Sequence, residues 1–188
     1  RETARGRGLA LTTVDVEGEG WRRSILAQNP AVLLCELEPV RAGEVVSALR
    51  EGGWTGSVLG GPSLAMADFT AVAGAAAAGA TFVTPWPFPA DVPGGDAFVS
   101  AYREVSQGSP PGPFALPAYE ATWMLLRALE EAAGAGAPTR EAVSAALADA
   151  DRQRTSSHSA ALPDVAMGET LYWYRIGPDG APVLLRQT

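Results

Sequence analysis

The stretch Ser57-Val-Leu-Gly-Gly-Pro-Ser63 decides the fold that the sequence predicts. It is a short apolar run that stops at two glycines and continues into a segment with helical periodicity, which is typical of a strand, a tight turn and a helix. In open α/β sheets, ligands lie where loops leave the carboxyl ends of strands, and Gly60 and Gly61 would let another group approach the backbone closely. Pro62 favours an extended entry, and Ser63 can cap the following helix. Taken alone, the motif favours a purely structural βα turn over a ligand loop.

Strand and helix patterns alternate on both sides of this turn, as in βαβ units that build a parallel sheet. The apolar run over residues 31–37 is expected to be a strand buried on both faces, as a parallel sheet requires. A rigid, proline-rich loop covers residues 85–95. The expected strands are 9–16, 31–37, 57–60 and 81–84, and the expected helices are 21–27, 40–51, 64–72, 98–105, 116–133 and 139–150.

Helical spacing identifies the expected core. Ala42, Val45, Val46 and Leu49 recur at i, i+3, i+4 and i+7, which predicts an amphipathic helix with this face buried. Other helices show similar stripes, and the aromatic pair Tyr119 and Trp123 is expected in the core rather than in a binding site. The further residues expected to face inward are Met66, Phe69, Phe98, Ala101, Tyr102, Val105, Val143, Ala146, Leu147 and Ala150.

Both ends of the chain carry local signals. Residues 170–176 and 181–186 flank the turn Gly177-Pro-Asp-Gly180, which predicts a β-hairpin. Residues 151–169 lose all periodicity and are expected to form a surface loop, and residues 1–8 are similar to the end of a helix that begins upstream. The expected fold is therefore α/β: a three-layer, Rossmann-like lobe over residues 1–150, truncated at its N-terminus, with a mostly parallel sheet, the loop 151–169 and a hinge-proximal hairpin over 170–188.

Composition excludes several classes of function. The net charge of −7 is scattered, and without a basic stripe nucleic acid is not an expected partner. Cys35 is the single cysteine and lies in an apolar run, so we expect a buried, inert thiol and no intrachain disulfide. One histidine and one cysteine leave no clustered metal site, and no cofactor motif is present. His158 lies in the least periodic segment and is expected to be a solvated loop residue rather than a catalytic one. No apolar run is long enough to insert into a membrane.

Two carboxylates stand at the carboxyl end of the expected strand 31–37. Glu36 and Glu38 are two residues apart, so on a strand they would share a face and could bind a cation or share a proton. The alternative is that one of them caps the next helix. Trp86 follows the strand 81–84 and is expected either to wall a pocket or to pack against the proline-rich loop.

Several motifs in one order resemble the C-terminal lobe of a type I periplasmic binding protein of the branched-chain amino acid (Leu/Ile/Val) ABC-transporter family. The resemblance covers essentially the whole chain. Its motifs are Asn29-Pro-Ala-Val-Leu33, Ala48-Leu-Arg-Glu-Gly-Gly-Trp-Thr-Gly56, the turn 60–63, Ala73-Gly-Ala-Ala-Ala-Ala-Gly79 with Phe82-Val-Thr-Pro-Trp86, Phe98-Val-Ser-Ala-Tyr-Arg103, Pro113-Phe-Ala-Leu-Pro-Ala-Tyr-Glu120 and Arg140-Glu-Ala-Val-Ser-Ala-Ala-Leu147.

The resemblance implies a non-catalytic lobe that closes with a second lobe over a small solute outside the cytoplasm. The implied partners are a small-molecule solute, with an amino acid or related polar compound as the candidate, an N-terminal lobe and an ABC permease. A lipid anchor would lie in an N-terminal segment outside this sequence. There are two alternatives to a solute-binding lobe. The first is a ligand-sensing regulatory domain of the same fold, and the second is an α/β hydrolase that uses Glu36 and Glu38 as acid and base.

The resemblance also carries expectations for single residues. An acidic residue that receives the ligand ammonium in family members matches Pro62 here, and an aromatic residue that covers the ligand matches Glu38. The family's closing segment falls between Ala161 and Glu169. The departures put an amino-acid ligand in doubt. The expected ligand contacts are Glu36, Glu38, Gly61, Pro62, Ser63 and Trp86, with Glu38 taking over recognition of a positive or hydroxyl-bearing group.

Overall fold

The computed structural model describes residues 8, 10–134, 136, 138–154 and 170–188. The chain divides into two compact units. The first comprises Arg1–Phe82 with Arg175–Val183, and the second comprises Val83–Tyr174 with Leu184–Thr188. His158, the segment Ala161–Glu169 and most of the expected loop 151–169 lie outside the described residues.

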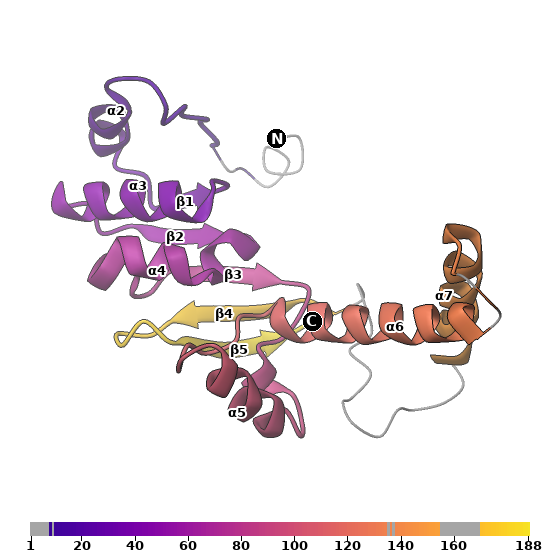
Figure 1. The fold of residues 1–188 in the computed structure, drawn as a ribbon. Helices are drawn as coiled ribbons and strands as arrows, with labels where there is room; N and C mark the ends of the chain where they lie inside the picture. Colours follow the sequence, from indigo (N-terminus) through magenta and orange to yellow (C-terminus); the bar gives the residue numbers. More distant parts are fainter. Residues whose placement is uncertain (1–7, 9, 135, 137, 155–169) are drawn as a thin grey trace. The chain divides into compact units, whose positions relative to one another are not determined.

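A five-stranded sheet with the strand order β1-β2-β3-β4-β5 runs through the fold (Figure 1). β1, β2 and β3 are parallel neighbours, and β4 and β5 form the hairpin that the sequence predicts. The sheet is therefore mixed and partly parallel, and the α/β fold class is confirmed. The strands are β1 Val32–Cys35, β2 Ser57–Gly60, β3 Thr81–Thr84, β4 Tyr172–Ile176 and β5 Pro182–Gln187.

Helices in the predicted places connect and follow the strands. In the first unit these are α2 Trp21–Gln28, α3 Pro39–Glu51, α4 Ala67–Ala73 and the short 3-10 helices η1 Pro62–Ala65 and η2 Gly74–Ala77. In the second unit they are η3 Pro89–Asp91, α5 Asp96–Val105, α6 Ala115–Gly134 and α7 Arg140–Arg154. α7 runs four residues beyond its expected end at residue 150.

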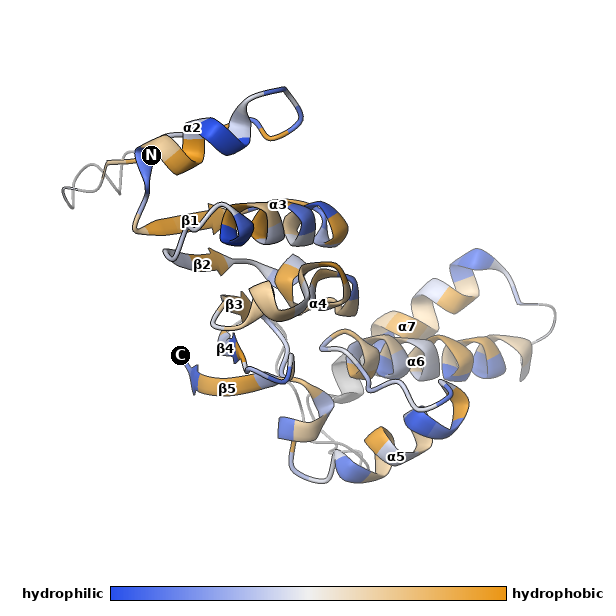
Figure 2. Ribbon diagram, turned by 90° about the vertical axis from the view of Figure 1, so that its left-hand side faces the viewer, coloured by the Kyte–Doolittle hydropathy of each residue, from blue (hydrophilic) through white to orange (hydrophobic). Residues whose placement is uncertain are grey.

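The core of the first unit lies between the parallel strands and the helices α3 and α4, which pack against each other and lie on one side of β1 and β2 (Figures 1 and 2). The predicted stripe of α3 is fully buried: Ala42, Val45, Val46 and Leu49 are at most 1% exposed. Phe69 of α4 is also completely buried, as expected, whereas Met66 is 37% exposed because it precedes the first turn of α4.

The prediction that residues 31–37 are buried on both faces is wrong. Val32 and Leu34 are 54% and 60% exposed, because they share the face of β1 that α3 and α4 do not cover. The predicted strand 9–16 is also wrong for its described part: residues 10–16 form no strand. β1 is therefore an edge strand of the sheet in the described residues, and its free edge is not paired with residues 10–16.

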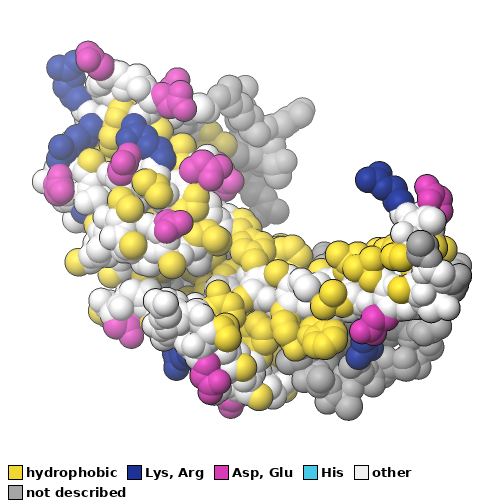
Figure 3. Space-filling model, in the orientation of Figure 1, with side chains coloured by type: hydrophobic (Ala, Val, Ile, Leu, Met, Phe, Trp, Pro, Cys, Tyr) yellow, Lys and Arg dark blue, Asp and Glu magenta, His cyan; other side chains and the backbone are white. Residues whose placement is uncertain are grey.

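In the second unit, α6 and α7 pack against each other, and α5 lies next to η3. The expectation of a core position for Tyr119 and Trp123 is wrong, because α6 buries Leu116, Ala128 and Ala132 and leaves these aromatic residues 45% and 48% exposed. In Figure 3 apolar side chains continue along the visible side of α6. α5 buries none of its residues, and Val105 is 82% exposed.

Candidate functional site

Strand register brings Glu36 and Gly61 together. Cys35 and Gly60 are paired at the carboxyl ends of β1 and β2, so the residues that follow them leave the sheet side by side. A Cβ atom built on Gly61 would lie 3.6 and 3.7 Å from the two carboxylate oxygens of Glu36. The side chain of Glu36 therefore lies along the glycine turn, at the edge of an α/β sheet where ligands usually bind.

The two glycines of the turn have different surroundings. A Cβ atom on Gly60 would lie 2.6 Å from Cδ1 of Leu64 and 2.8 Å from the carbonyl oxygen of Cys35, so only glycine fits there. Within the described residues, a Cβ atom on Gly61 would meet only the Glu36 carboxylate within 4 Å, at ordinary van der Waals distance. Gly60 therefore serves packing, and Gly61 leaves space beside a carboxylate.

Pro62 and Ser63 lie within η1, and the N-cap of η1 is Gly61. The expectation that Ser63 caps the following helix is wrong. Neither η1 nor α4 has a side-chain cap hydrogen bond, and the N-cap of α4 is Met66. The physical reason is the intervening 3-10 turn, in which the amide of Leu64 donates to the carbonyl oxygen of Gly61 (3.2 Å).

Glu38 occupies the N-cap position of α3, and its carbonyl oxygen accepts the amide of Ala42 at 2.8 Å. Its carboxylate makes no cap hydrogen bond, so the alternative in which a glutamate side chain caps this helix is not observed for Glu38. Glu36 and Glu38 are both exposed and follow the end of β1. Both carboxylates are therefore accessible at one edge of the first unit.

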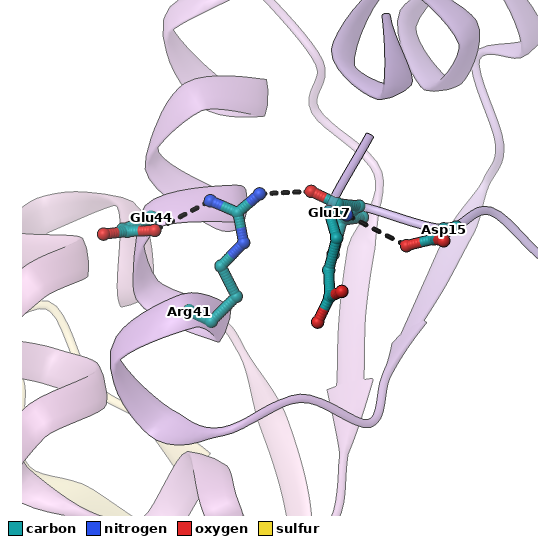
Figure 4. A network of polar contacts seen from close by, with 5 residues as sticks. Asp15, Glu17, Arg41 and Glu44 are labelled. Carbon is teal, nitrogen blue, oxygen red and sulfur yellow. Dashed lines mark hydrogen bonds and ion pairs between the residues drawn. The ribbon is translucent and has the colours of Figure 1, made fainter. Parts of the chain in front are cut away.

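Arg41, the arginine of α3 nearest in sequence to Glu36 and Glu38, already has other hydrogen-bond partners. Arg41 donates through Nη1 to Oε2 of Glu44 (2.8 Å) and through Nη2 to the carbonyl oxygen of Val16 (Figure 4). In the same loop as Val16, the amide of Glu17 donates to Oδ1 of Asp15 (2.9 Å). The contacts of Arg41 hold the guanidinium on the loop before α2. Among the described residues, no arginine forms an ion pair with Glu36 or Glu38.

The thiol of Cys35 is buried at the end of β1, as expected. Burial raises the pKa of Cys35 to about 11, and the neighbouring charge of Glu36 adds to this effect. The thiol is therefore protonated near neutral pH, and a role as a nucleophile is disfavoured.

Trp86 belongs to the second unit, where its surroundings are aromatic. Its ring packs edge-on against Phe114, with 5.3 Å between the ring centroids, and its amide lies 3.4 Å from Oγ1 of Thr84. Its indole Nε1 is buried and has no hydrogen-bond partner among the described residues. Packing on Phe114 thus accounts for one face of the ring, and one donor is left unused.

Sequence reasoning missed Tyr174. Its hydroxyl donates to Oδ2 of Asp91 (2.9 Å) and accepts the amide of Phe88 (3.0 Å), and its ring packs edge-on against Phe88 at 5.0 Å. The only local signal was a tyrosine at a buried position of a predicted strand. Its partners are 83 and 86 residues away in sequence, so no periodic pattern connects them.

The described part of the chain contains neither a cluster of metal-ligand side chains nor a helix that could span a membrane. No group of three or more histidine, cysteine, aspartate or glutamate side chains there could hold a metal ion. Within the same residues, every helix is too short or too polar to cross a bilayer.

Comparison with known proteins identifies relatives. Residues 10–170 match the sequence profile of a family described as periplasmic binding protein, and no match was found among curated proteins. An extracellular ligand-binding receptor from Rhodopseudomonas palustris HaA2 matches with 26% identity and a TM-score of 0.71, over 98% of this chain and 57% of that one.

Two further solved structures share the fold. The leucine binding protein LivK from Thermotoga maritima matches with 19% identity and a TM-score of 0.66, over 88% of this chain and 47% of that one. An ABC-transporter solute binding protein from R. palustris, solved with benzoate, matches with 19% identity and a TM-score of 0.68. The match covers 95% of this chain and 49% of that one. The chain thus spans about half the length of the solved structures that it matches.

Proposed function

The chain belongs to the periplasmic binding protein family, and on that premise we propose that it is one lobe of the solute-binding component of an ABC importer. It would bind a small solute outside the cytoplasm by closing against a second lobe and would deliver it to a membrane permease. The family is non-catalytic, so Glu36 and Glu38 are assigned as ligand contacts and not as the acid and base of a hydrolase.

The observation that carries the proposal is the Glu36 carboxylate beside Gly61. It is accessible, lies at the carboxyl ends of two parallel strands, and adjoins a glycine that leaves space for another group. Glu38, Pro62 and Ser63 continue the same edge of the first unit. Trp86 is proposed as a further contact from its position two residues after β3.

The charge of these residues suggests the class of solute. Two carboxylates without a paired cation among the described residues favour a ligand with an ammonium or hydroxyl group, because a charged hydrogen bond contributes about 1.5–3 kcal/mol. Position 62, a proline here, cannot provide an acid, so Glu36 and Glu38 would provide the negative charge from the neighbouring strand end. A leucine-like solute would satisfy this requirement, whereas a benzoate-like solute would not.

The test uses calorimetry on the protein at its natural length, with L-leucine as the probe that carries an ammonium group and benzoate as the probe that carries none. Glu36→Gln and Glu38→Gln are compared with Glu51→Gln. Glu51 lies at the other end of α3, about 20 Å away by helix rise, and has only a long 3.7 Å ion pair with Arg22.

We expect leucine to bind, benzoate not to bind, and at least one of Glu36→Gln and Glu38→Gln to weaken leucine binding about 10- to 100-fold while Glu51→Gln does not. Mass spectrometry of the solute that copurifies provides an independent identification. Unchanged affinity in both site variants, or preferential binding of benzoate, would refute the assigned ligand class.

A further inference from the structure

We propose that Tyr174 is a positioning residue that holds the Trp86 loop, residues 85–91, in its binding conformation. This inference rests on the proposed function, in which Trp86 contacts the solute. All of the groups involved lie in the second unit. The tyrosine itself is completely buried, so it acts on a ligand only through the loop.

The Tyr174 hydroxyl both accepts and donates a hydrogen bond. It accepts the backbone amide of Phe88 and donates to the carboxylate of Asp91, so it is bonded to two points of the Trp86 loop. The ring of Phe88 packs against the same tyrosine. Burial raises the pKa of Tyr174, so the hydroxyl remains protonated and able to donate throughout the physiological range.

Proline limits the hydrogen bonds that the loop itself can donate. Prolines at 85, 87 and 89 have no amide to donate, and the amide of Trp86 makes only a long contact with Thr84. The remaining backbone bonds are local, from Asp91 to Phe88 and from Val92 to Pro89. Proline fixes the backbone angle φ, but a contact from outside the loop is needed to hold it in place.

The consequence concerns the ring of Trp86, two residues before Phe88. The ring packs on Phe114, with its indole N–H not hydrogen-bonded, only while the loop keeps this conformation. A loop that is already ordered does not have to be ordered on binding, which improves affinity without a new contact. Tyr174 thus preorganises a contact that it does not itself make.

The experiment labels the five tryptophans of the chain with 5-fluorotryptophan and follows their fluorine NMR signals. Trp86→Phe assigns the Trp86 signal. Tyr174→Phe removes the hydroxyl and keeps the ring. Asp91→Ala removes one of the two partners from an exposed position, where loss of the fold is not expected, and Asp91→Asn retains an acceptor for the hydroxyl. Tyr172→Phe, on the same strand, is the matched control.

We expect Tyr174→Phe and Asp91→Ala to shift or broaden the Trp86 signal, Asp91→Asn to restore it, and Tyr172→Phe to leave it unchanged. Affinity for the L-leucine probe should fall about 2- to 10-fold in Tyr174→Phe, the cost of ordering a side chain on binding. A Trp86 signal that stays unchanged in both Tyr174→Phe and Asp91→Ala would overturn the inference.

The failure of the inference can be distinguished from that of the proposed function by Trp86→Ala. If this variant binds leucine normally while Tyr174→Phe still shifts the Trp86 signal, Tyr174 positions the loop but Trp86 is not a ligand contact. If Trp86→Ala loses binding while Tyr174→Phe leaves the signal unchanged, Trp86 is a contact but Tyr174 does not position it.

Discussion

The two glycines of the turn between β2 and η1 should respond in opposite ways to alanine. At Gly60 the new methyl group would lie 2.6 Å from Cδ1 of Leu64 and 2.8 Å from the carbonyl oxygen of Cys35. The Leu64 side chain can rotate, but the Cys35 carbonyl belongs to β1 and cannot move without disturbing the strand pair. At Gly61 the methyl group would meet only the Glu36 carboxylate at 3.6 and 3.7 Å, and its φ of −91° suits any residue.

The expected difference in stability follows from these distances. Both substitutions reduce the entropy of the unfolded chain, which stabilises each variant by about 0.4–1 kcal/mol. Only Gly60→Ala adds the cost of overpacking, about 1–3 kcal/mol. The difference between the two alanine variants therefore isolates that cost, and it corresponds to a melting temperature lower by about 2–12 °C for Gly60→Ala in a chain of this size.

Urea unfolding followed by circular dichroism measures the effect, with the slope m checked for constancy. Gly61→Ala should be at least as stable as the unsubstituted chain, and its closeness to Glu36 should appear instead as weaker binding of the leucine probe. Equal midpoints for the two alanine variants would show that the close packing around Gly60 does not constrain the turn, and would refute the reasoning.

Three further predictions concern the first unit. The folded-state pKa of Cys35 is raised from 9.0 to about 11, so the unfolded thiol ionises first; in pH-dependent urea titrations the unsubstituted chain should lose about 2 kcal/mol more stability than Cys35→Ala as pH rises from 9 to 11, and the loss that both chains share includes the contribution of the raised Tyr174 pKa. Phe69→Ala empties a fully buried site between α3 and α4 and should cost about 3–5 kcal/mol in the same titrations. The indole N–H of Trp54 donates to the carbonyl oxygen of Pro30 at 2.8 Å, and Trp54→Phe removes this donor. Calorimetric melting should show a loss of stability of about 1–3 kcal/mol.

Much of the fold could be predicted because its signals are local. The stripe Ala42, Val45, Val46 and Leu49 is one face of a helix, and all four residues are buried. The turn Gly177-Pro-Asp-Gly180 connects the two strands of the hairpin because its residues suit a reversal whatever lies around them. Aromatic residues were harder to place: Tyr119 has the spacing of a core residue, yet α6 buries Leu116, Ala128 and Ala132 instead, and the tyrosine remains exposed.

The candidate site could likewise be predicted from the sequence only in part. The sequence by itself determined that Gly60 and Gly61 end a strand and that Glu36 and Glu38 stand at the carboxyl end of another, because strand, turn and helix propensities depend on neighbours along the chain. Only the tertiary structure decided that the Glu36 carboxylate lies along Gly61 and that Tyr174 bonds to Phe88 and Asp91. These contacts depend on strand pairing and packing between residues far apart in sequence. The glycine turn was therefore recognisable from its own residues, but its carboxylate neighbour was not.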